Sequence, residues 1–514
     1  MFQKMLRCLL ALALILALAA PALAQEPVEL RILTTWKVSD SNPEFNESVV
    51  AKELQDILDV KITPVYTTKD SIATKVANML SNGEFPDLAM TRVDTSANTF
   101  ATVNKYGQRG YFLAISDYLD KMPNLKAVLE AYPQIVRSIT AEDGKFYVLP
   151  LICDFADIMY TTALVREDVL KECGLSAEGI VTIDDLTNAL LQMTEKKGTP
   201  AWIQREGYDE FMMYSGYLWN VSNKVFWDYE TNAYTHAAKL ERYKSYIAWL
   251  NQLYTAGAIH PDWTIMSDET WEGMLAADQG FFTIDRMSII GDSNFDPSFD
   301  WQPVMYPQID GKAFLQPQRK IVDPNNSWVI NAKSSPEVIE KALQFVDYMY
   351  SGENHNQLLA VGVEGKTWTR ENANTAAGIR WLVQIYGENS DVEGAEPYSK
   401  HAPQSFTRLY RAIDLLAFPG KYPYVAQEFT NKVMETVGGF RPAEPFLSFT
   451  DAELQSISAI EADLNTYFDE NIVKFVEGTR PMDQWDSFTQ EIEGLGLDQL
   501  LSLYNGALER YNKR

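Results

Sequence analysis

Hydrophobic and polar positions follow two different periods in the first part of the chain. The segment 29–34 predicts a first strand, and alternating apolar and polar residues predict a second strand at 61–66. Between them, apolar residues recur every three or four positions, which predicts a helix capped by Asn42. An amphipathic helix over 72–80 and a short buried strand at 87–90 follow. This regular alternation of strands and helices indicates an α/β architecture with a parallel sheet.

The middle of the chain continues in the same manner. A strand is predicted at 145–151 and a helix at 165–172. Thr182 with Asp185 forms a capping-box pattern, with Asp in place of the usual Glu, so a helix begins there. Another strand is predicted at 280–284.

The last third predicts mainly helices. A short strand at 327–331 precedes a helix that opens after Ser335 and continues through Tyr350. The pair Thr450 and Glu453 begins a long helical region at the carboxyl end. Since the chain contains no flexible linker and is long for a single domain, we expect two lobes joined by short crossings.

The first 24 residues have the composition of a secretory signal peptide. Two basic residues precede an apolar run over 8–20, and the small residues Ala22 and Ala24 form a cleavage site before Gln25. The alternative of an uncleaved membrane anchor stays open. We therefore expect an exported protein, periplasmic or at the cell surface, that meets no nucleotide. No cysteine stands at the cleavage site, so a lipid anchor is not expected.

Charge and aromatic content narrow the possible ligands. The formal net charge of −26 over 514 residues disfavours nucleic acid and anionic lipid, and favours a soluble monomer. The 12 Trp and 26 Tyr exceed what a core needs, and such side chains stack on the apolar faces of sugar rings. The alternative, that any one of them is a half-buried core residue, stays open.

The sequence contains no recognisable catalytic or metal-binding motif. Four histidines are scattered without paired spacing, so neither zinc nor any other cofactor is predicted. Cys153 and Cys173 leave a disulfide bridge open. Glycoside cleavage needs only two carboxylates at a defined separation, so an enzyme is not excluded by sequence.

Five segments together resemble a known family. They are 83–88 (GEFPDL), 143–150 (DGKFYVLP), 165–175 (VREDVLKECGL), 362–366 (GVEGK) and 507–511 (ALERY). Their order and spacing are similar to those of the extracellular solute-binding proteins of family 1, in the lipoprotein-LplA-like branch. Two features of that branch are missing here: an acidic calcium loop and the lipid-attachment cysteine.

The resemblance implies a fold and a role. It implies the two-lobed periplasmic-binding-protein fold (type II-like), in which each lobe is a mainly parallel sheet flanked by helices, with a helical C-terminal region. The expected first lobe holds 25–150 plus 328–362, and the second holds 151–327 plus 363–514. The resemblance also implies that an oligosaccharide binds in the cleft and is delivered to the permease of an ABC importer.

Candidate ligand contacts follow from the resemblance and from the rule that ligands gather at the carboxyl ends of strands in open α/β sheets. Carboxylates and guanidinium groups can each engage two hydroxyls, and Trp faces stack on sugar rings. The alternative for each charged residue is a solvated loop charge or a surface ion pair. The candidates are Trp36, Lys37, Arg92, Asp94, Asp154, Tyr160, Asp285, Arg286, Trp328 and Trp368.

The sequence thus predicts an exported binding protein, not an enzyme. It would capture a carbohydrate by closure of two lobes about a hinge. The alternative from another class is an exported polysaccharide-degrading hydrolase or lyase. A third possibility is a receptor of the same fold for a peptide or another solute.

Overall fold

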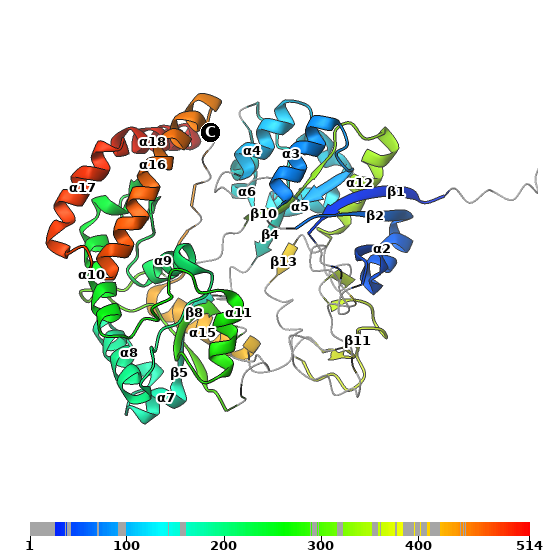
Figure 1. The fold of residues 1–514 in the computed structure, drawn as a ribbon. Coiled ribbons are helices and arrows are strands. Elements are labelled where there is room, and N and C mark those ends of the chain that lie inside the picture. Colours follow the sequence, from blue (N-terminus) through cyan, green and yellow to red (C-terminus); the bar gives the residue numbers. More distant parts are fainter. Residues whose placement is uncertain are drawn as a thin grey trace, which may run out of the picture.

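In the computed structural model, the two largest β-sheets of the described residues each have their own core and their own helices (Figure 1). We call them the first and the second unit. The structure describes residues 26–35, 38, 43–68, 71–90, 99–141, 143–154, 161–287, 289, 296, 298–315, 322–351, 358–359, 361–375, 378–383, 395, 401, 409–411, 422–442, 444–445, 447 and 449–513.

The first unit is built on a six-stranded sheet in the order β13-β4-β10-β3-β1-β2. All neighbouring strands are parallel except β10, which runs antiparallel to β3 and β4. The carboxyl ends of β1, β3, β4 and β13 therefore lie at one edge of the sheet, which we call the crossing edge. The strands are β1 (Val28–Thr34), β2 (Val60–Tyr66), β3 (Leu88–Met90), β4 (Leu149–Asp154), β10 (Val322–Ile330) and β13 (Leu409–Arg411).

Helices pack around this sheet because each has an apolar stripe directed at the same core. In α12, for example, Leu343, Phe345 and Val346 are buried in the cluster that also contains Leu30 and Ile330 of the sheet. These helices are α2 (Val49–Leu58), α3 (Ile72–Asn82), α4 (Thr99–Gln108), α5 (Pro123–Ala131), α6 (Pro133–Ile139) and α12 (Pro336–Tyr348).

The second unit has a three-stranded sheet in the order β8-β5-β9. Both pairings are antiparallel, so the expectation of a mainly parallel sheet is wrong for this unit. The strands are β5 (Thr161–Arg166), β8 (Phe282–Arg286) and β9 (Trp301–Val304); β6 (Val225–Asp228) and β7 (Ala233–His236) form a separate hairpin. The helices are α7 (Glu167–Glu172), α8 (Ile183–Lys197), α9 (Gly207–Leu218), α10 (Glu241–Thr255), α11 (Asp268–Ala276) and α15 (Tyr422–Val437).

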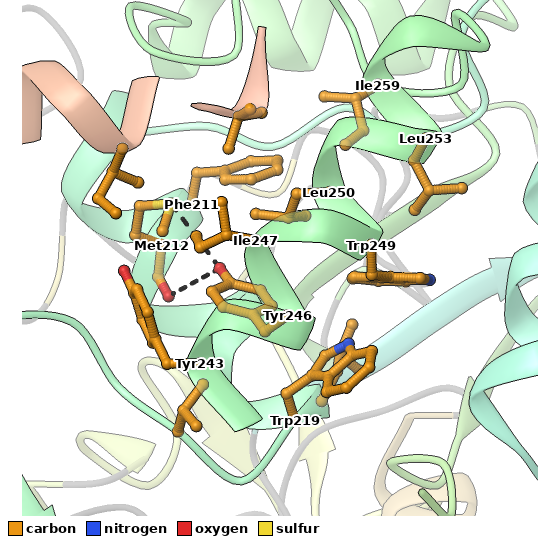
Figure 2. Packing of buried hydrophobic residues seen from close by; sticks show 14 of the residues in the cluster. Phe211, Met212, Trp219, Tyr243, Tyr246, Ile247, Trp249, Leu250, Leu253 and Ile259 are labelled. Atoms are coloured by element: carbon orange, nitrogen blue, oxygen red, sulfur yellow. Dashed lines mark hydrogen bonds between the residues drawn. The ribbon is translucent and has the colours of Figure 1, made fainter. Parts of the chain in front are cut away.

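Aromatic residues form the centre of this unit, where α9 and α10 meet (Figure 2). Tyr246 is fully buried, and its hydroxyl lies 2.6 Å from the hydroxyl of Ser215. Trp249 on the next turn packs beside Trp219, with ring centroids 5.9 Å apart. Many of the tryptophans and tyrosines counted in the sequence are therefore core residues.

The C-terminal helices belong to the second unit. Helices α16 (Asp451–Val476), α17 (Trp485–Gly494) and α18 (Leu497–Asn512) pack together, and α16 lies along α10 (Figure 1, orange to red). Their buried residues, such as Phe468 and Phe488, extend the same aromatic core. A smaller hairpin, β11 (Trp368–Thr369) with β12 (Arg380–Trp381), forms a separate apolar cluster.

Local signals in the sequence predict several element boundaries correctly and miss others. The capping boxes of Thr182 with Asp185 and of Thr450 with Glu453 are both formed. The predicted start of the first helix at Asn42 is wrong, because α2 begins at Val49 and Ser48 caps it by accepting from Ala51 N.

Other predicted boundaries also differ from the structure. Val165 and Arg166, predicted as helix, lie in β5, and the strand predicted at 145–151 pairs only from Leu149 onward. The lobe limits at 150/151 and 327/328 stay predictions; the two positions lie within the ranges of β4 and β10.

The sequence leaves two questions open: the state of the cysteines and the presence of a membrane-spanning helix. Cys173 carries a free, half-buried thiol, whereas the side chain of Cys153 is outside the described residues. No described helix combines the length and apolar character that a membrane crossing requires.

A buried histidine makes the second unit sensitive to acid. The fully buried His236 ring accepts from Ala238 N through Nδ1 at 3.2 Å and packs edge-on against Phe468. Burial, with smaller contributions from Lys239 and Lys224, lowers the pKa of His236 from 6.5 to about 3. The unfolded chain therefore takes up a proton between these pH values that the folded chain does not.

We expect the free energy of unfolding to fall by about 4 kcal/mol between pH 6.5 and pH 3 because of His236 alone. His236→Asn keeps an acceptor for Ala238 N and should remove this part of the pH dependence, measured by denaturant unfolding at several pH values. His260→Asn is the matched control, because His260 Nδ1 accepts from Asp262 N at an exposed position. Equal pH profiles for the wild type and His236→Asn would contradict the assignment.

Candidate functional site

Two short joins fix how the two sheets face each other. Six residues separate Asp154, the end of β4, from Thr161, the start of β5. Six residues also separate Leu315 of the second unit from Val322, the start of β10. Seven residue steps span at most about 25 Å when fully extended. The crossing edge of the first sheet therefore lies within that reach of the Thr161 end of the second.

The register of the second sheet shows which residues lie at that end. Thr161 pairs with Arg286, the last residue of β8, and Ala163 pairs with Val304, the last residue of β9. The carboxyl ends of β8 and β9 therefore face the first unit. The loop after β9 brings Tyr306 to the same end.

Asp285 at this end forms a buried ion pair. The carboxylate is 2% exposed and accepts from Arg205 Nε at 2.5 Å and from Nη2 at 2.8 Å. The backbone N–H of Arg286 donates to the same carboxylate at 2.6 Å. The Arg205 guanidinium lies 5.0 Å from the Trp271 ring centroid. Asp285 therefore fixes Arg205 and the end of β8, and its oxygens already accept three hydrogen bonds.

Helix α9 presents a row of polar side chains that the sequence analysis does not single out. Glu210, Tyr214 and Tyr217 have the i, i+4, i+7 spacing of one helix face. The Tyr214 and Tyr217 ring centroids are 6.1 Å apart, and the Tyr217 ring stacks on Tyr306 at 6.4 Å. We call these four residues the α9 row. It links α9 to the loop after β9.

The start of α9 is held in an unusual backbone conformation. Glu206 has φ +62° and Gly207 has φ +68°, and a Cβ atom on Gly207 would lie 2.9 Å from the Thr264 carbonyl oxygen. A glycine is therefore required at 207. The turn leaves Glu206 exposed close to Glu210.

Glu210 supplies the carboxyl group of the α9 row. Its Oε2 atom is buried without a hydrogen-bond partner. Burial raises the pKa of Glu210 from 4.5 to about 7, and the nearby carboxylates of Glu206 and Asp285 contribute to the shift. A carboxyl group with this pKa can accept from a ligand hydroxyl when ionised and donate to one when protonated.

The remaining predicted contacts fall into two groups. Trp328 is fully buried in the core of the first unit, where it stacks on Phe345, and Trp368 is 2% exposed in the β11–β12 cluster. Neither placement favours ligand contact, and both roles stay predictions. Trp36, Lys37, Arg92, Asp94, Tyr160 and the side chain of Asp154 lie outside the described residues.

A cavity of about 520 Å³ lies within the second unit, between β9, α7 and α15. Its lining includes Gln302 and Tyr306 on one side and Phe429 on the other. Tyr306 therefore belongs both to the lining of this cavity and to the α9 row. In the described part of the chain, no cluster of three or more His, Cys, Asp or Glu residues is arranged to hold a metal ion.

Comparison with known proteins identifies the class. Residues 42–355 match the model of the bacterial extracellular solute-binding protein family. Because the match covers more than half of the chain, the protein belongs to this family. Its members are binding proteins, so the alternative of a polysaccharide-degrading enzyme is not supported.

Individual relatives cover nearly the whole chain. The fructooligosaccharide ABC transporter substrate-binding protein FusA of Streptococcus pneumoniae is 22% identical, over 95% of this chain and 91% of FusA. An extracellular solute-binding protein from Bifidobacterium longum subsp. infantis superposes with a TM-score of 0.72 at 17% identity, covering 94% of this chain and 98% of that one.

A third protein, AlgQ2, also has a similar structure. The alginate-binding protein AlgQ2, in a structure without calcium, gives a TM-score of 0.68 at 21% identity, with 96% and 99% of the two chains covered. These likenesses confirm the two-lobed α/β fold.

The raised pKa of Glu210 predicts how the free energy of unfolding depends on pH. The unfolded chain loses this proton near pH 4.5 and the folded chain near pH 7, so the fold loses stability as pH rises between the two values. We expect Glu210→Gln to increase the free energy of unfolding by about 3 kcal/mol at pH 8 and little at pH 4.5. Urea unfolding at both pH values measures this, with the exposed Glu195→Gln as control. No gain at pH 8 would contradict the assignment.

Proposed function

We propose that this chain is an exported receptor that binds an oligosaccharide between its two units and delivers it to an ABC importer. The observation that carries the proposal is the α9 row, which combines stacked tyrosine rings with a partly unsatisfied carboxyl group at the end of the second sheet that faces the first. Aromatic faces and carboxylates are the groups that bind the apolar faces and hydroxyls of sugars. FusA, a fructooligosaccharide-binding protein, and AlgQ2, an alginate-binding protein, support a saccharide ligand for this chain.

The two walls of the proposed site come from different units. In the first unit, Trp36 and Lys37 follow β1, Arg92 and Asp94 follow β3, and Asp154 ends β4, so all five follow strands that end at the crossing edge. In the second unit, the α9 row and Arg286 provide the opposite wall. Tyr160 precedes β5, on the join between the units.

The proposed mechanism is closure of the two units about their joins. Leu151 of β4 is buried in a cluster whose other members all belong to the second unit, such as Leu164 and Phe429. The units are therefore packed together near one join, which favours a hinge over a loose tether. A ligand that contacts both walls stabilises the closed state, and that state would dock on the permease.

The cellular setting is part of the proposal. Residues 1–24 would direct export and be removed, which leaves a monomeric receptor outside the cytoplasm without a cysteine for lipid attachment. Permease subunits would be its partners.

Binding tests the proposal directly. We expect oligosaccharides of the fructo-, manno- or galacto- series to raise the melting temperature, because a ligand that binds only the folded state stabilises it. Tyr214→Ala should weaken binding of the best ligand about tenfold through loss of ring stacking, whereas Tyr214→Phe should retain most of the affinity. Isothermal titration calorimetry measures both.

Tyr254→Ala is the control, because this half-buried tyrosine lies on α10 outside the α9 row. Absence of any stabilising saccharide, or release of new reducing ends from the ligand, would overturn the proposed function.

A further inference from the structure

Arg441 is a buried cation beside the α9 row. It follows α15 after a turn at Gly438 and Gly439, and it is only 8% exposed. Its guanidinium carbon lies 5.5 Å from the ring centroids of both Tyr217 and Tyr229. The side chain is therefore held between two aromatic rings, one of which belongs to the α9 row.

The hydrogen-bonding capacity of this guanidinium is incompletely used. Its Nε donates to the Leu315 carbonyl at 3.2 Å, and its Nη2 is buried without a partner. Among the described residues, Glu444 is the carboxylate that acts on this guanidinium electrostatically, and it makes no hydrogen bond to Nη2. Burial lowers the pKa of Arg441, which reflects the cost of holding its charge away from water.

This arrangement favours an incoming anion. Because Arg441 is already desolvated in the free protein, a carboxylate that reaches Nη2 gains a charge-assisted hydrogen bond without a new desolvation cost on the protein side. The net charge of −26 repels anions at a distance. The electrostatic field of the whole protein therefore cannot produce a preference for an anionic ligand. Such a preference requires a cation close to the bound ligand.

Arg441 and Glu210 are far enough apart for one oligosaccharide to contact both. Tyr217 lies seven residues after Glu210 on α9, a rise of about 10 Å. Glu210, with Glu206 and Asp285 nearby, is thus separated by more than one pyranose ring from Tyr217, which lies beside Arg441. An oligosaccharide can place hydroxyls near Glu210 and a carboxylate near Arg441.

We propose that Arg441 binds a carboxylate of the saccharide, so that the receptor prefers acidic oligosaccharides that contain uronic or sialic residues. This inference rests on the proposed function and specifies its ligand class.

Two matched pairs of probes test the inference: trigalacturonic acid with its trimethyl ester, and 3′-sialyllactose with lactose. By calorimetry at pH 7, we expect the acid of at least one pair to bind the wild type about tenfold more tightly than its neutral partner. Arg441→Gln should abolish that difference while retaining the affinity for the neutral partner, which also shows that the variant is folded. Arg441→Lys should retain part of the preference, because it keeps the charge and loses the planar fork.

Arg137→Gln is the control, since it removes the same charge from the exposed surface of α6. It should leave the preference unchanged. The inference is overturned if neutral saccharides bind and no acid binds more tightly, or if Arg441→Gln weakens acid and neutral probes equally; the proposed function then stands. Failure of all saccharides to bind would defeat the proposed function and this inference together.

Discussion

The shortness of the two joins between the sheets is the constraint on which the rest of this structure depends. Asp154 to Thr161 and Leu315 to Val322 each allow at most about 25 Å of extended chain. Since β4 and β10 are neighbours, both joins reach the same edge of the first sheet. The carboxyl ends of its parallel strands are therefore directed at the second unit, which brings segments far apart in the sequence to the facing ends of the two sheets.

The second unit keeps polar groups that its own folding does not satisfy. Oε2 of Glu210 and Nη2 of Arg441 are buried without partners near opposite ends of the α9 row, and Glu206 holds a left-handed backbone conformation close to Glu210. Each feature costs stability in the free protein. Polar groups that are already ordered and desolvated lose little further freedom or hydration when a ligand binds. The same groups lower the stability of the free protein and raise its affinity for the ligand.

Sequence periodicity and capping residues predict most of the first unit, because local patterns decide where strands and helices begin. The failures have physical causes. Val165 and Arg166 lie in a strand since pairing with β8 and β9 outweighs the helical pattern that continues into α7. At the proposed site, the strand-end rule points to Asp285, whose role in ligand binding stays a prediction because its carboxylate is engaged by Arg205. The α9 row was missed because a carboxylate and two tyrosines at helical spacing are equally typical of an ordinary amphipathic face, and Arg441 joins them only through tertiary packing.

Strand β13 has a consequence for how this protein is made. Residues 409–411 pair with the outer edge of β4, although nearly the whole first unit has been synthesised more than fifty residues earlier. Until that late segment arrives, β4 presents an open backbone edge of the kind that attracts other strands. An unpaired β4 edge would therefore favour association between incompletely synthesised chains until residues 409–411 are available to cover it.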